Sequence, residues 1–339
     1  MSLRMTAPLL QADRVSRIYG DGLLSAGHTL ALDKFSLSIN IEKPSVTAIV
    51  GESGSGKTTL ARVLLGLTAP SSGVVRYRGE DISRLSGHAR RSYRTDIQAI
   101  FQDPYGVFNP FYRVDHVLTT PVRKFRLASS RAEARTLIEQ ALRTVGLRPE
   151  EILGRYPHQL SGGQRQRTMV ARALLLKPKI IIADEPVSMV DASLRATILG
   201  SLRRLTDELG ISILYITHDL ATAWQVSDNV IVMYRAAAVE AGQAEAVVKT
   251  PAHPYTRLLV GSIPQVSVTR DWLSAEPDTH RPENRDAACR FADRCASAMA
   301  VCLTERPPLS RIGPRHTAAC HLYGEHAQLA AEDLNDVLA

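Results

Sequence analysis

Long apolar runs, internal repeats and low-complexity tracts are all missing from this sequence of 339 residues. The richest apolar runs, residues 173–176 and 230–234, end at Lys177 and Arg235, whereas a membrane-spanning helix needs roughly 18 uninterrupted apolar residues. Neither Gly nor Pro follows a fixed period, which excludes collagen. Pro8 and Gln11 interrupt the first 14 residues, so we predict no secretory signal and a reducing cytoplasmic location.

The overall composition is that of a globular protein. Hydrophobic residues make up 45% of the chain and charged residues 22%, so it can bury a substantial core, and its length favours about two domains. The balance of 41 Lys and Arg against 34 Asp and Glu gives a formal net charge of +7, which is weak evidence for a nucleic-acid or membrane partner. We therefore expect no nucleic acid among its partners.

Strand-like and helix-like segments alternate along the chain, which indicates an α/β fold with a parallel sheet. Buried strands are predicted at residues 46–50, 180–183 and 211–216. A helix with one apolar face follows the first strand, and another, ending at Gly210, separates the second and third. Functional groups gather at the carboxyl ends of such strands, where the sequence has Asp184, Glu185 and His218.

Two further segments differ from this pattern. Residues 85–160 lack strong strand patterns and show helical spacing, so we predict a helical subdomain there. From about residue 250 the chain becomes rich in Pro, Arg and Cys, which indicates a separate C-terminal module. The predicted organisation is therefore a domain over residues 1–250 and a module over residues 251–339.

The first predicted strand runs into a phosphate-binding loop. Residues 51–58 read Gly-Glu-Ser-Gly-Ser-Gly-Lys-Thr and match G-x-x-x-x-G-K-[ST] between a strand and a helix. Glycines let backbone N–H groups converge on phosphate oxygens, to which the helix N-terminus adds a positive field. We predict that this loop binds ATP or GTP through Gly51, Ser53, Gly54, Ser55, Gly56, Lys57, Thr58 and Thr59, with Lys57 on the β- and γ-phosphates and Thr58 on Mg²⁺.

The acidic pair after the second strand completes the predicted site. We expect Asp184 to hold Mg²⁺ through water, and Glu185 to act as the general base that activates the attacking water. An acidic pair after a strand is by itself more often a helix N-terminus. The upstream phosphate-binding loop favours the catalytic interpretation.

Residues 160–164, Leu-Ser-Gly-Gly-Gln, carry a resemblance to a known family. With the loop at 51–58 and the acidic pair, they resemble the ATP-binding cassette (ABC) transporter ATPases. Residues 101–104, 253–256 and the final cysteines are similar to the oligopeptide/dipeptide importer branch. The resemblance implies a P-loop NTPase cassette fold with a mixed sheet and a helical subdomain, and a small C-terminal module that contains the cysteines.

The resemblance also implies roles for further residues. Two subunits would pair head to tail, so that Ser161, Gly162, Gly163 and Gln164 of one close on the ATP of the other. Gln102 would sense Mg²⁺ and the γ-phosphate, and His218 would contact the γ-phosphate and fix the attacking water. Asp191 would make contacts across the dimer, and Tyr19 would stack on adenine. Met189-Val190 and Arg235-Ala-Ala-Ala238 depart from the usual family pattern.

The four cysteines, Cys289, Cys295, Cys302 and Cys320, are separated by 5, 6 and 17 residues. Disulfides are rare in the cytosol, whereas four thiolates can hold Zn²⁺ or an iron–sulfur cluster. The spacing lacks the C-x₂-C knuckle of structural zinc, and peptide-importer ATPases with this tail resemble proteins that carry a 4Fe-4S centre. We therefore predict such a cluster. Zinc, with His316 or His321 as substitute ligands, and unligated structural thiols remain alternatives.

These features together predict an ATP-hydrolysing subunit that powers import of peptides through an ABC transporter. Its implied place is the cytoplasmic face of a bacterial inner membrane, with a second ATPase subunit, two permeases and an external solute-binding protein. Nickel, glutathione and opines are alternative cargoes. A soluble ABC protein acting on nucleic acid or ribosomes is disfavoured because tandem cassettes and a long coiled coil are missing. A nucleotide kinase is disfavoured because it would not need residues 160–164.

Overall fold

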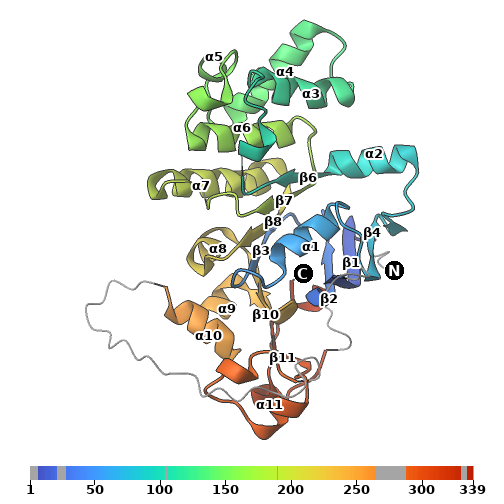
Figure 1. Ribbon diagram of the computed structural model, residues 1–339, viewed down its shortest axis with the longest axis vertical. Helices are drawn as coiled ribbons and strands as arrows, with labels where there is room; N and C mark the ends of the chain where they lie inside the picture. Colours follow the sequence, from blue (N-terminus) through green and yellow to red (C-terminus); the bar gives the residue numbers. More distant parts are fainter. Residues whose placement is uncertain are drawn as a thin grey trace. The chain divides into compact units, whose positions relative to one another are not determined.

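Figure 1 shows the computed structural model, which describes residues 7–20, 28–103, 105–188, 190–263, 288–329 and 334–338. The chain divides into two compact units. The first contains residues up to 39, residues 47–83 and those from 217 onwards; the second contains residues 40–46 and 84–216. Pro104 and Met189, and the prolines at 264, 277 and 282 within the predicted tail module, lie outside the described residues.

The first unit contains an antiparallel sheet with strand order β2-β1-β4-β5. Its strands are β1 (Leu10–Tyr19), β2 (Thr29–Ile39), β4 (Ser72–Tyr77) and β5 (Glu80–Asp81). Leu10, Leu32 and Phe35 are buried in its core. The register between β1 and β2 shifts after Ala12, as bulged antiparallel pairs commonly do.

The same unit contains parallel and antiparallel strands of a second sheet. Strand β3 (Val46–Val50) pairs in parallel with β9 (Asn229–Tyr234). Strand β10 (Ala237–Gln243) then pairs antiparallel with β9, β12 (His316–Ala319) with β10, and β11 (Leu309–Gly313) with β12. The turn between β9 and β10 has positive φ at Arg235 (42°) and Ala236 (71°). The sequence therefore adopts the two-residue hairpin turn at some cost in backbone strain.

Short helices complete the first unit. They are α1 (Lys57–Leu64), α8 (Leu220–Val226), α9 (Ala244–Lys249), α10 (Pro254–Gly261), α11 (Ala300–Thr304) and α12 (Asn335–Leu338), with the 3₁₀ turns η3 (Ala292–Arg294) and η4 (His321–Tyr323). Because β12 adds to the edge of β10, the C-terminal segment belongs to the same compact unit as the phosphate-binding loop. The predicted boundary at residue 250 therefore does not coincide with these units.

The second unit has three parallel strands in the order β8-β7-β6. They are β6 (Ile97–Ile100), β7 (Ile180–Asp184) and β8 (Ser212–Thr217), and every residue of β7 and β8 is buried. The strand β6 lies inside the segment for which we predicted only helices. Its four residues are too few to show a strand pattern, and pairing with β7 decides their conformation.

Helices make up most of the second unit. They are α2 (Gly87–Asp96), α3 (Asp115–Lys124), α4 (Arg131–Thr144), α5 (Pro149–Ile152), α6 (Gly162–Leu174) and α7 (Ala192–Leu209), with the 3₁₀ turns η1 (Tyr105–Val107) and η2 (Pro157–Gln159). Helices α3, α4 and α6 pack on one another (Figure 1). Gly210 ends α7 in the left-handed conformation, with φ of 66°, as predicted.

One buried histidine of the first unit gives the protein a pH-dependent stability. His253 is 2% exposed and caps α10, because its Nδ1 accepts a hydrogen bond from the Tyr255 N–H at 3.1 Å. Burial lowers the pKa of His253 from 6.5 to about 4, so the folded chain keeps the imidazole neutral while the unfolded chain takes up a proton. Its contribution to stability is therefore present above pH 6.5 and is lost as the pH falls towards 4.

We expect this loss to amount to about 3 kcal/mol between pH 6.5 and 4. The free energy of unfolding of the parent chain, measured by urea denaturation across that range, is compared with that of a His253→Asn variant, whose amide can still cap the helix. The variant should show a flatter pH dependence. An unchanged slope would mean that His253 is not the group responsible.

Candidate functional site

The loop between β3 and α1 needs glycine at two positions for steric reasons. A Cβ at Gly51 would lie 2.1 Å from the Met233 carbonyl oxygen, and one at Gly56 would lie 2.2 Å from the Ala31 carbonyl oxygen. Gly56 also has φ of +104°, where side chains of L-residues are strained. The tertiary structure thus explains both glycines that the phosphate-binding pattern requires, Gly51 and Gly56.

Lys57 lies at the start of α1 with its side chain buried. Its Nζ donates hydrogen bonds to the carbonyl oxygens of Gly51 at 2.7 Å and Glu52 at 2.8 Å. Ser55 is buried beside it, whereas Ser53, Gly54 and Thr58 are exposed. The ammonium group and the exposed Thr58 therefore both lie at the N-terminus of a helix, a position that stabilises phosphate charge.

Two further predicted residues belong to the first unit. Tyr19 ends β1 and is half-buried, with the Arg17 guanidinium carbon 4.7 Å from its ring centroid. His218 follows β8 directly and is exposed. The next residue, Asp219, caps α8 by accepting a hydrogen bond from the Ala221 N–H at 2.9 Å, which fixes the backbone beside the histidine.

The second unit brings together two predicted residues that are 83 positions apart. The Gln102 side-chain amide donates a hydrogen bond to the Glu185 carboxylate at 3.0 Å. The parallel pairing of β6 with β7 explains this contact, since Gln102 follows the end of β6 and Glu185 the end of β7. Asp184, the last residue of β7, is 5% exposed. Both acidic residues thus lie at the carboxyl edge of the strands, as predicted.

Glu185 has an unusual backbone conformation. Its φ of +46° is in the left-handed region, which costs a residue with a side chain about 1–3 kcal/mol. The Glu185 N–H donates to the Ile216 carbonyl at 2.8 Å, and the Glu185 carbonyl accepts from the Ser188 hydroxyl at 3.0 Å. These bonds from the neighbouring strand and the following turn hold the strained conformation. No local sequence signal predicts it, because it depends on pairing with β8.

The segment at residues 160–164 forms the N-terminus of α6 by a capping box. Ser161 Oγ accepts from the Gln164 N–H at 3.2 Å, and Gln164 Oε1 accepts from the Ser161 N–H at 3.0 Å. The first-turn N–H groups of Gly162 and Gly163 have no acceptor within an α-helix. The arrangement suits an anion at this helix N-terminus, and it gives Gln164 a structural role as well.

Asp191 precedes α7 and is exposed. Its carbonyl accepts a hydrogen bond from the Arg195 N–H at 3.0 Å, but its side chain makes no capping hydrogen bond. The carboxylate is thus presented to solvent rather than used within the helix. This position leaves the predicted contacts across a dimer sterically open.

All four cysteines line one small cavity of about 10 Å³, and none of them is in a disulfide. Cys302 and Cys320 are buried, and Cys289 and Cys295 are half-buried. Burial raises the pKa of Cys289 to about 11 and raises those of Cys295 and Cys320. In the part of the chain that the structure describes, no group of three or more His, Cys, Asp or Glu side chains is placed to hold a metal ion. The thiols are therefore gathered in one place without forming a ligand set.

The two histidines predicted as substitute ligands differ in position. His316 Nε2 lies 2.7 Å from Glu240 Oε1, and His316 does not line the thiol cavity. His321 does line that cavity, and its Nε2 lies 3.0 Å from the Glu305 carbonyl oxygen. Of these two histidines, only His321 therefore lines the cavity with the four thiols, which His253 also lines.

The sequence analysis missed a connection between the cysteine-containing segment and the phosphate-binding loop. Arg294, between Cys289 and Cys302 in the chain, forms a bidentate ion pair with Glu52, with N–O distances of 2.9 and 3.0 Å. The Tyr255 hydroxyl accepts a hydrogen bond from the Glu52 N–H at 2.8 Å, and burial raises the pKa of Tyr255 to about 12, so this phenol stays protonated. Two contacts thus fix the second residue of the loop.

We expect an Arg294→Gln variant to raise the KM for ATP about 2–5-fold and to leave kcat unchanged. The ion pair is partly exposed, so its contribution is about 0.2–1 kcal/mol, and it acts on the loop rather than on the reacting atoms. Steady-state ATPase kinetics check this, with Arg148→Gln, which breaks a surface ion pair in the other unit, as control. Adding Glu52→Gln to Arg294→Gln should change KM no further; an additive effect would contradict the coupling.

Among the described residues, no helix has both the length and the apolar character needed to cross a bilayer.

Comparison with known proteins shows which family the chain resembles. The sequence pattern of the family described as "ABC transporter" matches residues 35–188, and that described as "Oligopeptide/dipeptide transporter, C-terminal region" matches residues 239–302. The chain is 38% identical over 302 residues to the oligopeptide transport ATP-binding protein AppF of Bacillus subtilis, covering 88% of this chain and 91% of AppF. It is 38% identical over 288 residues to OppF of Escherichia coli, covering 84% and 86% respectively.

Solved structures show the same architecture. One is cbiO1 of Clostridium perfringens, part of an ABC transporter complex, with a TM-score of 0.61 and 29% identity over 72% of this chain and 92% of that one. Another is a dimeric ATP-binding cassette in a post-hydrolysis state with ADP and phosphate, with a TM-score of 0.61 and 28% identity over 69% of this chain and 98% of that one. The predicted cassette fold, a P-loop NTPase with a mixed sheet and helices, is confirmed.

Proposed function

The chain belongs to the ABC transporter family, in its branch of oligopeptide and dipeptide transport ATP-binding proteins, and from this premise we propose that it hydrolyses ATP to drive peptide import. The relatives matched over most of their length are named for oligopeptide transport, which favours peptides over nickel, glutathione or opines as cargo. ATP binding and hydrolysis follow from the family, whose solved members include a cassette with ADP and phosphate bound.

The family resemblance implies a separate role for each of these residues. Lys57 would contact the β- and γ-phosphates. Thr58, Asp184 and Gln102 would hold Mg²⁺, which would supply charge neutralisation on the phosphates. Glu185 accepts a proton from the attacking water, and His218 holds that water and the γ-phosphate. Tyr19 stacks on adenine.

The observation that carries this proposal is the hydrogen bond between Gln102 and Glu185 at 3.0 Å, together with the strained backbone of Glu185. A carboxylate held at the end of a buried strand by bonds from two other segments is pre-organised to accept a proton in a defined direction. The Gln102 amide beside it can contact both the metal ion and the Glu185 carboxylate. Both features support catalysis rather than simple nucleotide binding.

We infer that the working assembly contains a second ATPase subunit, either identical or related, two permeases and an external solute-binding protein. In it, the α6 N-terminus with Ser161, Gly162, Gly163 and Gln164 meets the neighbour's nucleotide, and Asp191 contacts the other subunit. The chain would then be peripheral on the cytoplasmic face of a bacterial inner membrane. The exposed Asp191 carboxylate and the capped α6 N-terminus support this arrangement.

The test is reconstitution of the chain in proteoliposomes with its permeases, partner cassette and solute-binding protein. We expect peptide uptake that depends on ATP, and ATP hydrolysis that peptide-loaded binding protein stimulates. Hydrolysis without peptide uptake, but with uptake of another solute, would reassign the cargo. A chain that retains no nucleotide in the presence of Mg²⁺ and its partner cassette would refute the proposal.

We further propose that Cys289, Cys295, Cys302 and Cys320 bind a 4Fe-4S cluster. The observation that supports this proposal is that all four cysteines line a single cavity. Their side chains must move to become ligands, because the described residues form no ligand set in their present positions. Burial raises the pKa values of Cys289, Cys295 and Cys320, so cluster binding would displace protons from these thiols and its affinity would fall at low pH. The cluster would cross-link residues 289–320 and so stabilise their fold.

Anaerobic purification followed by iron and sulfide analysis tests this proposal. We expect about four of each per chain, lost in a Cys302→Ser variant, and a brown protein with visible absorbance. Stoichiometric zinc without sulfide would favour the zinc alternative, and a colourless protein without metal would leave four structural thiols.

A further inference from the structure

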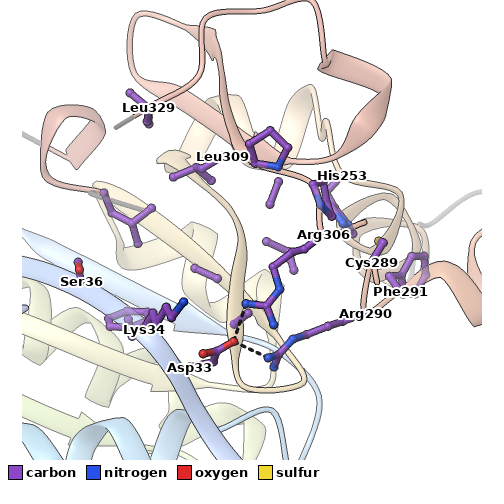
Figure 2. Close-up of a pocket in the computed structure, with 18 residues that line it drawn as sticks. Asp33, Lys34, Ser36, His253, Cys289, Arg290, Phe291, Arg306, Leu309 and Leu329 are labelled. Carbon is purple, nitrogen blue, oxygen red and sulfur yellow. Dashed lines mark hydrogen bonds and ion pairs between the residues drawn. The ribbon is translucent and has the colours of Figure 1, made fainter. Parts of the chain in front are cut away.

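A second and larger cavity lies in the first unit, away from the residues assigned to ATP. Its volume is about 300 Å³, at the lower end of the range for small-molecule sites. Residues 33–36 of β2 and 237–239 of β10 line it, together with residues 289–291 and 306–309 of the C-terminal segment. Figure 2 shows Asp33 and Lys34 near Arg290 and Arg306. The cavity therefore exists only because the C-terminal segment packs beside these strands.

Most of the cavity wall is apolar. Phe35, Val239, Leu309, Leu329 and Leu334 contribute to it. An apolar wall offers water few hydrogen-bond partners, so water in such a space is easily displaced by an apolar ligand. At roughly 30 Å³ for each water-sized group, the cavity holds a ligand of about ten non-hydrogen atoms.

One end of the cavity is charged. The Asp33 carboxylate lies 2.6 Å from Arg290 Nη2 and 2.7 Å from Arg306 Nη1, and both nitrogens contact the same oxygen, Oδ2 (Figure 2). Among the residues that the structure describes, this lining includes the cations Lys34, Arg290 and Arg306 and the anion Asp33. Of the two arginines, Arg306 is the more accessible, since its side chain is 30% exposed and that of Arg290 10%. The charge balance of this end favours an anion, and guanidinium groups match carboxylates in geometry.

We propose that this cavity is a binding site for a small apolar carboxylate. The chain of the ligand lies against the apolar wall, and its carboxylate is bound by Arg306, with Lys34 adding positive charge. An anion of this kind satisfies both halves of the lining at once. A neutral apolar molecule leaves the charged end unused, and a small hydrophilic anion leaves the apolar wall unused.

The site is connected to the phosphate-binding loop by two backbone hydrogen bonds. The Asp33 N–H donates to the Ala236 carbonyl at 2.9 Å, and the Ala236 N–H donates to the Ser55 carbonyl at 3.0 Å. A ligand carboxylate bound to Arg306 competes with the Asp33 carboxylate for the guanidinium group. Ligand binding therefore changes the contacts of Asp33 in β2, which is connected to the loop through these hydrogen bonds. The linked effect on ATP rests on the proposed function, and by thermodynamic reciprocity ATP must change the ligand's affinity by the same factor.

The test uses the full chain without nucleotide and octanoate, which has ten non-hydrogen atoms, as the probe in isothermal titration calorimetry. We expect saturable binding of one octanoate per chain, with a Kd of about 1 mM or tighter. Two probes isolate the two halves of the site: 1-octanol lacks the charge, and acetate lacks the apolar chain. 1-Octanol should bind at least about tenfold more weakly, because a hydrogen bond to a charged group contributes roughly that factor or more. Acetate should also bind at least about tenfold more weakly, because it lacks the methylene groups that octanoate buries against the apolar wall.

Two variants locate the binding site. Arg306→Gln should weaken octanoate binding about tenfold or more, and Ala238→Leu, which adds bulk to the wall, should abolish it. Lys249→Gln, which removes a surface charge in α9 outside the cavity, is the matched control and should bind as the parent does. Thermal unfolding shows whether each variant is folded. If Ala238→Leu is not folded, Ala237→Val replaces it, and if Arg306→Gln is not folded, Arg306→Lys replaces it.

Absence of octanoate binding at 10-fold above the expected Kd, or equal binding by Ala238→Leu, would overturn the site. Equal binding of 1-octanol would overturn its anion selectivity. Titration of ATP with and without octanoate then tests the connection to the loop. Because octanoate binding is measured without nucleotide, its failure leaves the proposed ATPase function untouched, and failure of ATP binding leaves the cavity result standing.

Discussion

A Glu185→Gln variant is expected to bind ATP as tightly as the parent chain and to hydrolyse it about 10²–10⁴-fold more slowly, the range typical for loss of a general base. The amide keeps the shape of the carboxylate but cannot accept a proton from water. Gln102 loses a charged acceptor but faces an amide oxygen at the same position. The substitution changes no residue of the phosphate-binding loop, so we expect the binding contacts from that loop to persist.

The measurement is phosphate release in single-turnover experiments with the partner cassette, combined with equilibrium binding of a fluorescent ATP analogue. Glu151→Gln, an exposed change of the same kind in α5, is the matched control and should retain parent activity. A Glu185→Gln chain with undiminished turnover would remove Glu185 from the role of base. Loss of ATP binding in that variant would instead indicate a structural role.

A Gly56→Ala variant is expected to lose about 2–5 kcal/mol of unfolding free energy in its unit, combining the backbone strain of positive φ with the cost of overpacking. The added methyl would lie 2.2 Å from the Ala31 carbonyl oxygen, so β2 or the loop must move. Because Lys57 follows directly, this movement displaces the ammonium group. ATP binding should therefore fall together with stability.

Gly54→Ala is the matched control for this prediction. Gly54 also has positive φ, +81°, but its added Cβ would meet nothing within 4 Å, so this variant pays only the backbone strain, about 1–2 kcal/mol. Thermal unfolding followed by circular dichroism, with and without ATP, compares the two. Equal losses would mean that the close approach to Ala31 is not significant.

The predicted strands at residues 46–50, 180–183 and 211–216 were found within one residue of their expected ends. Residues 180–183 are a continuous apolar run, and the other two segments are apolar apart from Thr47 and Ser212. Such runs are typical of strands that are covered on both faces. Ser161, which caps α6, and Gly210, which ends α7, were also predicted from the sequence, because each acts on backbone groups close to it in the chain. Strand β6, with four residues, was not predicted.

The cysteines show where sequence reasoning reached its limit. Their clustering in the final part of the chain predicted that they would come together, and all four line one cavity. Their spacing could not show whether the side chains form a ligand set, and in the described structure they do not. Ligand geometry depends on side-chain rotamers and on the packing of η3 and α11, which spacing does not record.

By itself, the sequence located the phosphate-binding loop, the acidic pair and the helix cap at residues 160–164, because each is marked by a pattern of residue types that are close in the chain. Only the tertiary structure decided the left-handed backbone of Glu185, its bond to Gln102, the tie from Arg294 to Glu52 and the cavity beside Arg306. Each of these joins segments between 31 and 273 positions apart. Such contacts form because strands pair and faces are buried, and no local pattern specifies which distant segment will be the partner.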